Sequence, residues 1–129
     1  MNRLLLDTTV LIDLSKGFGD VLTSLHALVA TGAVLGVSAV SVSEFFAGVP
    51  APERRQWQHW IADLEYWDIT REAAALAGAF RYDLARQGRA LHIPNALMAA
   101  TAVVMDATLV TSNIKDYPMP GLRLLRLGS

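Results

Sequence analysis

The 129-residue chain contains no cysteine. This excludes a disulfide framework, a cysteine-ligated zinc or iron–sulfur site, and thiol catalysis. It also agrees with a reducing compartment, and we expect a cytoplasmic protein. No glycine-rich fingerprint follows the first apolar run, which argues against dinucleotide binding.

An excess of basic residues is also lacking. Eleven Lys and Arg stand against twelve Asp and Glu, so the net charge is −1. Nucleic-acid-binding proteins usually carry a basic footprint, and the whole-chain charge shows none. A local group of Arg81, Arg86 and Arg89 remains. Two interpretations of it are open: a weak contact with RNA phosphates, or solvated positions on one helix.

Long apolar runs are missing, although 53% of the residues are hydrophobic. The longest charge-free stretch, residues 27–43, is interrupted by Gly32 and Gly36, and a membrane span needs roughly 20 continuous apolar residues. The apolar run before Asp7 is too short for a signal peptide. We therefore expect one soluble domain over residues 1–129, with no membrane contact and a parallel sheet buried on both faces.

Apolar runs that fit strands alternate with segments of helical spacing. The predicted strands are residues 3–6, 34–37, 66–69, 108–111 and 122–125, and the predicted helices are residues 8–16, 20–31, 41–48, 53–65, 70–88 and 95–105. Such alternation predicts parallel pairing with helices on both faces. The expected fold class is α/β, a three-layer α/β/α domain around a mostly parallel sheet of four to five strands.

Polar residues follow the predicted strands or begin helices, and each has an ordinary structural explanation. Asp7 ends the first strand and could cap the next helix. Glu44 fits a capping box that starts at Ser41. Asn95 could cap its own helix, and the polar run 111–117 resembles an ordinary turn.

Taken together, these residues indicate a site at the carboxyl ends of the strands, where parallel sheets place their sites. Clustered carboxylates repel one another, and a divalent cation relieves that repulsion. Oxygen ligands suit Mg²⁺ or Mn²⁺, and such ions assist phosphodiester hydrolysis. The residues therefore suggest a divalent-metal site.

Four segments in order resemble the PIN-domain family, and within it the VapC-type toxins of toxin–antitoxin pairs. The segments are LLLDTTVL (residues 4–11), SVSEFFAG (41–48), IPNALMAATA (93–102) and TLVTSNIKDY (108–117). The resemblance continues to the predicted last strand, so it covers essentially the whole chain.

The resemblance implies an Mg²⁺- or Mn²⁺-dependent endoribonuclease toxin, neutralised by a VapB-like antitoxin that covers an apolar groove. It also implies an RNA substrate and a homodimer. Carried over, the catalytic and metal-binding positions are Asp7, Glu44, Asn95 and Asp116. The supporting residues that would orient ligands, water or phosphate are Thr9, Thr111 and Asn113.

The chain departs from the family pattern at two positions. Thr9 stands where Asn or Ser is frequent, and its hydroxyl still forms hydrogen bonds. Asn95 stands where the family has Asp, which removes one negative charge and weakens metal binding. Asn95 is either an introduced change that disarms the nuclease or a natural feature of a weakened site, and the intact flanking pattern favours the first. The alternative function is a catalytically silent PIN-like module that binds a protein partner.

Aromatic residues and histidines carry no motif of their own. The helical spacing of Trp57 and Trp60 favours protein contacts over base stacking, and we expect the same of Tyr66 and Trp67. The three histidines show no acid–base pairing pattern, and we expect them at surface or half-buried positions. They are His26, His59 and His92.

Overall fold

The computed structural model describes residues 2–127 and contains a five-stranded sheet with helices between the strands. The strands are β1 (Arg3–Leu6), β2 (Val34–Val37), β3 (Glu65–Tyr66), β4 (Thr108–Thr111) and β5 (Leu124–Arg126). The helices are α1 (Thr8–Ser15), α2 (Gly19–Ala30), α3 (Ala39–Ala47), α4 (Arg54–Ile61), α5 (Arg71–Arg86) and α6 (Ile93–Val104), with 3-10 turns η1 (Ala51–Glu53) and η2 (Ile114–Asp116). All pairings are parallel, in the order β3-β2-β1-β4-β5. The predicted fold class is confirmed.

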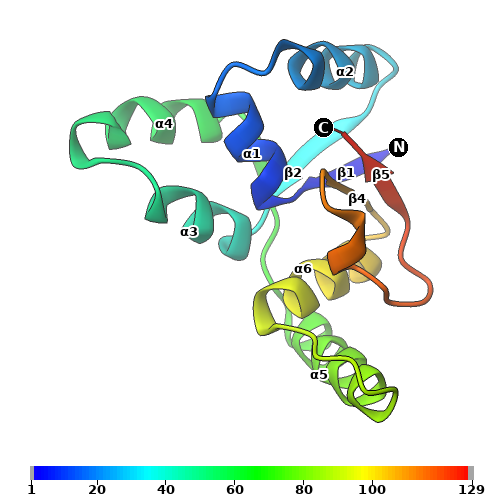
Figure 1. Ribbon diagram of the computed structural model, residues 1–129. Helices are drawn as coiled ribbons and strands as arrows, with labels where there is room; N and C mark the ends of the chain where they lie inside the picture. The colour runs from blue at the N-terminus through cyan, green and yellow to red at the C-terminus, as the bar shows by residue number, and fades with distance from the viewer. Residues whose placement is uncertain (1, 128–129) are drawn as a thin grey trace.

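The sheet lies between two helical layers (Figure 1), with α1 and α2 on one side and α5 and α6 on the other. Successive side chains of a strand point to opposite faces. Leu5 of β1 accordingly packs in the cluster under α5 and α6, whereas Leu4 and Leu6 pack under the helices of the other side. Because both faces are covered, the central strands consist mostly of apolar residues, which contributes to the high hydrophobic content.

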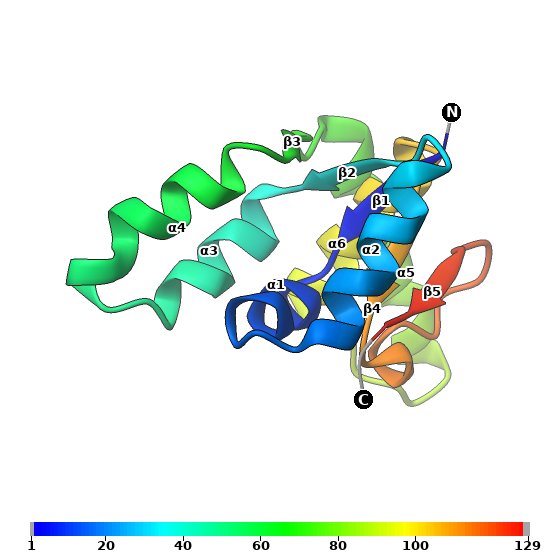
Figure 2. The same cartoon turned by 90° about the horizontal axis from the view of Figure 1, so that it is seen from above.

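Helices α3 and α4 project together away from the sheet, as both ribbon views show (Figures 1 and 2). Aromatic contacts join the two helices: the Phe45 ring of α3 lies 5.9 Å from Trp57 and 6.1 Å from Trp60 of α4. Trp67 is buried against β2, where a Cβ on Gly36 would come within 2.5 Å of its ring. Tyr66 is exposed. The expected protein contacts are therefore confirmed for the three tryptophans.

The element boundaries differ from the predictions at several ends. The third helix begins after Ser38 rather than at Ser41, because Ser38 and Ser41 form the reciprocal capping box. Helix α4 ends at Ile61, where the chain turns toward a β3 of only two residues. The last strand begins two residues later and ends one residue later than predicted, so that it includes Arg126.

Two exposed apolar side chains show that α2 buries a narrower stripe than its sequence suggests. Helical spacing places Leu22 and Val29 beside the apolar face of Val21 and Leu25, but both are exposed. Val21 and Leu25 lie four residues apart, on the side that faces the sheet. Among residues 2–127, no helix is long and apolar enough to cross a membrane.

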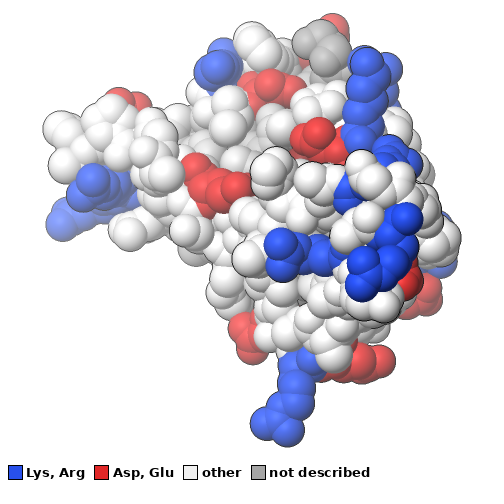
Figure 3. All heavy atoms as spheres, turned by 60° about the horizontal axis from the view of Figure 1, so that its bottom comes forward, with Lys and Arg blue, Asp and Glu red and all other residues white. Residues whose placement is uncertain are grey.

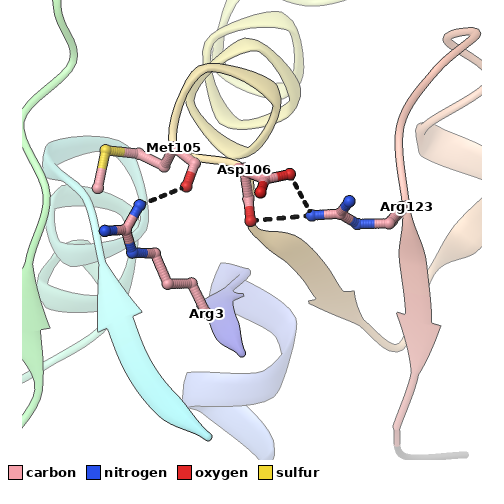
Figure 4. Close-up of polar contacts among 4 residues, drawn as sticks. All are labelled: Arg3, Met105, Asp106 and Arg123. Carbon is pink, nitrogen blue, oxygen red and sulfur yellow. Dashed lines mark hydrogen bonds and ion pairs between the residues drawn. The ribbon is translucent and has the colours of Figure 1, made fainter. Parts of the chain in front are cut away.

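The amino ends of the strands are closed by arginine contacts (Figure 4). Arg3 Nη1 donates to the Met105 carbonyl at 2.8 Å. Arg123 Nη2 donates to both the carbonyl and Oδ1 of Asp106, each at 2.8 Å. Asp106 has a φ of 53°, in the left-handed region. These contacts hold the turn between α6 and β4, and they leave the carboxyl ends of the strands as the open edge of the sheet.

Candidate active site

Asp7 lies where β1 gives way to α1, at the carboxyl edge of the sheet. Its backbone N–H donates to the Val110 carbonyl at 2.9 Å, and its own carbonyl accepts the Val10 N–H at 3.1 Å. The backbone thus joins strand to helix, while the side chain makes no capping hydrogen bond. The structure does not support the capping explanation for the Asp7 side chain, which is available for other contacts.

Three hydroxyl groups surround the buried Asp7 carboxylate, of which 6% is exposed. Thr111 Oγ1 donates to Oδ2 at 2.8 Å, and Thr9 Oγ1 donates to the same oxygen at 3.2 Å. Tyr117 donates its phenolic hydrogen to Oδ1 at 2.9 Å. These donors are neutral, so they orient the carboxylate without cancelling its charge. A buried carboxylate without a counter-charge is costly, and a cation relieves that cost.

Thr9 and Thr111 also fix the turn that follows β4. The Ser112 N–H donates to Thr9 Oγ1 at 3.1 Å, and the Asn113 N–H donates to Thr111 Oγ1 at 3.0 Å. The Asn113 side chain donates from Nδ2 to Asp116 Oδ2 at 2.8 Å. The two threonines therefore contact Asp7 directly, and Asn113 orients Asp116.

Glu44 is the sixth residue of α3, and its side chain is exposed. Its Oε1 accepts the Thr8 hydroxyl at 2.7 Å, which ties α3 to the first turn of α1 beside Asp7. The predicted capping box between Ser41 and Glu44 is wrong, because Ser41 serves as the third helical residue behind Ser38. The helix cap thus leaves the Glu44 carboxylate free for other contacts.

Tyr117 is a site residue that the sequence interpretation missed. Burial raises the pKa of its phenol far above the ordinary range, and the nearby charges of Asp7, Asp116 and Glu44 raise it further. The hydrogen bond to Asp7 acts in the same direction. The charges of three carboxylates that are distant from one another in sequence therefore act on the pKa of the same phenol. A hydroxyl-bearing aromatic directly after Asp116 was the available signal.

Asn95 lies half-buried in the first turn of α6. The hydrogen bonds that link Asp7 and Asp116 to their neighbours do not include it. Within residues 2–127, no three His, Cys, Asp or Glu side chains gather closely enough to hold a metal by themselves. Mg²⁺ usually keeps several waters and takes one or two carboxylates. The oxygen donors around Asp7 therefore fit such an ion.

The structure divides the three predicted RNA-contact arginines. Arg81 and Arg89 border one cavity beside the start of α6, and Arg81 Nε donates to the Leu91 carbonyl at 3.0 Å. Arg86 borders another cavity and lies 4.1 Å from the Tyr82 ring centre. Figure 3 shows Lys and Arg gathered on the right of the face that carries α5, with separate acidic groups above and to the left.

All three histidines are exposed, as predicted: His26, His59 and His92.

The sequence of the chain is similar to those of known ribonucleases. The chain is 28% identical over 115 residues to Ribonuclease VapC19 of Mycobacterium tuberculosis, covering 89% of the chain and 92% of that protein. It is 24% identical over 118 residues to Ribonuclease VapC2 of Rickettsia felis, covering 88% of each.

Solved structures share the fold over nearly the whole chain. The DNA-bound VapBC of Salmonella typhimurium has a TM-score of 0.83 at 26% identity and 98% coverage of both chains. VapBC2 of Rickettsia felis, bound to a promoter DNA fragment, has a TM-score of 0.85 at 23% identity, covering 98% of this chain and 99% of that one. The family model of the PIN domain matches residues 4–116. With Asp7 at the carboxyl edge of a parallel sheet of this topology, the chain belongs to the PIN-domain family.

Proposed function

We propose that the chain is a metal-dependent endoribonuclease of the VapC type, acting as the toxin of a toxin–antitoxin pair in the cytoplasm. The observation that carries this proposal is the buried Asp7 carboxylate, held by three hydroxyl groups, with Glu44 tied to the first turn of the adjacent helix. The ribonucleases VapC19 and VapC2, which resemble the chain over most of its length, support it.

In this proposal the carboxylates hold one or more Mg²⁺ or Mn²⁺ ions with their waters. Asp7 is the central ligand because its orientation is fixed before any ion arrives. Glu44 and Asp116 add negative charge from α3 and from η2, and both are exposed. When bound, the metal activates water and stabilises the leaving oxygen of a phosphodiester.

The chain's own side chains supply positioning. Thr9 and Thr111 hold Oδ2 of Asp7, and Asn113 holds Asp116 in place. Because Oδ2 already accepts two hydrogen bonds and Oδ1 accepts one, Oδ1 is the oxygen of Asp7 that would bind a cation. Arg81 and Arg89, which share a cavity with His92, are the predicted arginines best placed to touch RNA phosphates together.

Asn95 lowers the negative charge of the site by one relative to the family's Asp. An amide oxygen still coordinates a hard cation, but without the charge that strengthens the bond. We therefore expect weak metal binding and weak cleavage by the chain as written.

The test is RNA cleavage by the chain and by its Asn95→Asp variant, with Mn²⁺ and with chelator. We expect Asn95→Asp to cut at least about 10-fold faster than the chain as written, with chelator abolishing the difference. Asp7→Ala in the Asn95→Asp background is the control and should remove the gain.

Cleavage by neither form, together with no Mn²⁺ binding, would contradict the enzyme and favour a silent PIN-like module that binds a protein. Cleavage by the chain at the rate of Asn95→Asp would show that the missing charge is unimportant.

A VapB-like antitoxin is the proposed partner, with a groove between α1, α3 and α4 as its contact. The cavity there is bordered by Ile12, Phe45 and Trp57 and reaches Glu44, so a bound segment would approach the acidic site. Several of the solved relatives are VapBC toxin–antitoxin complexes. If this surface binds the antitoxin, Trp57→Ala should weaken complex formation in calorimetry, whereas Arg71→Ala on α5 should not. The proposed homodimer is testable by light scattering.

A further inference from the structure

A polar cavity lies beside Thr9, on the side of β5. It has a volume of about 430 Å³ and is bordered by Thr9, Ser112, Asn113, Ile114, Lys115 and Arg126. That volume falls within the roughly 300–1,000 Å³ of small-ligand sites. Thr9 connects the two sites, because it borders this cavity and its hydroxyl donates to Asp7 Oδ2. The cavity therefore adjoins the Asp7 site through one shared residue.

The sheet register fixes Arg126 next to the Asp7 site. Arg126 of β5 pairs with Thr111 of β4, and directly paired residues point to the same face of a sheet. The Leu127 N–H donates to the Thr111 carbonyl at 3.1 Å, which anchors the backbone at this point. Thr111 is the residue that donates to Asp7 at 2.8 Å. Arg126 thus emerges one strand away from the residue that orients the acid.

Lys115 brings a second positive charge from η2 to the same cavity. Both Lys115 and Arg126 are exposed, and neither pairs with a carboxylate of residues 2–127, where the ion pair is that of Arg123 and Asp106. Within the described residues, two cations without a carboxylate partner therefore adjoin the acidic site at Asp7. This alternation suits a phosphodiester chain: the acids hold a metal at one phosphate, and the cations neutralise the next one.

We propose that Lys115 and Arg126 bind the RNA backbone phosphate adjacent to the one held at Asp7. The proposal rests on the proposed function for its substrate, and it adds the path of the strand from the acidic site toward β5. Arg126 forms the fixed part of this phosphate subsite, since its backbone belongs to the sheet, and Lys115 closes over it from η2.

The test is binding of a fluorescent single-stranded RNA 12-mer to the full chain in chelator, where no cleavage occurs, measured by anisotropy at several salt concentrations. Each phosphate contact with a single strand contributes about 0.7 to the slope of log affinity against log salt. Lys115→Gln and Arg126→Gln should each weaken binding about fivefold at 0.1 M salt, and the double variant should lower the slope by about 0.7, because the two cations neutralise one phosphate. Lys115→Arg should retain binding.

Arg55→Gln on the projecting helix α4 is the matched control, because it removes an exposed positive charge far from the cavity. Thermal melting checks that each variant is folded. A double variant that binds RNA with the affinity and salt slope of Arg55→Gln would overturn the subsite. So would a parent chain that binds no RNA in chelator. Either result leaves the nuclease itself to be decided by the cleavage assay of Asn95→Asp, so the two proposals fail separately.

Discussion

The two edges of the sheet differ in how their charged side chains are paired. At the amino edge, Arg3 and Arg123 bind the turn that leads into β4. The ion pair of Arg123 and Asp106 is largely exposed, with 59% and 86% of the two side chains accessible. At the carboxyl ends of the neighbouring strands, Asp7 is 6% exposed and meets only neutral hydroxyl donors in its hydrogen bonds. One edge uses opposite charges in water to hold a turn. The other edge buries the carboxylate of Asp7 without a positively charged partner among its hydrogen bonds, as is typical of a cation-binding site.

The largest effect expected on stability separates two buried threonines. Thr111→Val removes the hydroxyl that donates to Asp7 and accepts from Asn113, so the free energy of unfolding should fall by about 1–3 kcal/mol. Thr101 is equally buried, but its Oγ1 has no partner within the described chain. Thr101→Val should therefore leave stability unchanged or raise it. Urea denaturation measures both, and equal losses would contradict the assignment of the Thr111 hydroxyl to the site.

High pH should lower the stability of the fold through the buried phenol of Tyr117. The folded state raises the pKa of Tyr117, so the stability that it contributes is complete below about pH 10, the pKa of a free phenol, and falls as the pH rises further. In chelator, the free energy of unfolding should fall by up to about 1.4 kcal/mol per pH unit more steeply in the parent than in Tyr117→Phe. Parallel pH profiles of the two chains would show that Tyr117 ionises as an exposed phenol does.

Metal affinity should respond to the same hydroxyl group. Tyr117→Phe leaves Oδ1 of Asp7 without its donor, and loss of such a supporting hydrogen bond typically weakens metal binding by about 10-fold or more. Tyr66→Phe removes an exposed hydroxyl and serves as the control. Mn²⁺ calorimetry on both variants checks the difference, and unchanged affinity in Tyr117→Phe would deny it a positioning role.

The smallest effect belongs to the amino edge. Arg123→Gln removes an exposed ion pair, which should cost less than about 1 kcal/mol and less still at high salt. Mn²⁺ affinity should stay the same, because the change lies at the opposite end of the strands. A large loss in chemical denaturation would mean that this edge is more than a surface contact.

Sequence patterns predicted the fold well where they were strong. The strands at residues 3–6, 34–37 and 108–111 were predicted exactly, because buried parallel strands are short apolar runs between polar ends. The edge strands β3 and β5 were displaced. Their residues are partly exposed and their pattern is correspondingly weak.

The sequence predicted which residues lie at the candidate site better than it predicted which of them contact one another. Asp7, Thr9 and Thr111 come together as expected, since each follows or adjoins a strand end. The link from Tyr117 to Asp7 spans 110 residues, and no local pattern reports such a contact. Arg126 was missed for a related reason: its role depends on its register with Thr111, which only the assembled sheet reveals.

We propose that the carboxyl edge of the sheet holds a cation and that the amino edge does not. The most direct measurement is Mn²⁺ calorimetry on the chain as written, on Asp7→Asn and on Asp106→Asn, a matched loss of one acid at the opposite edge. We expect the parent and Asp106→Asn to bind Mn²⁺ with equal affinity. We expect Asp7→Asn to bind Mn²⁺ at least about 100-fold more weakly. Equal binding by Asp7→Asn, or no binding by the parent, would contradict it.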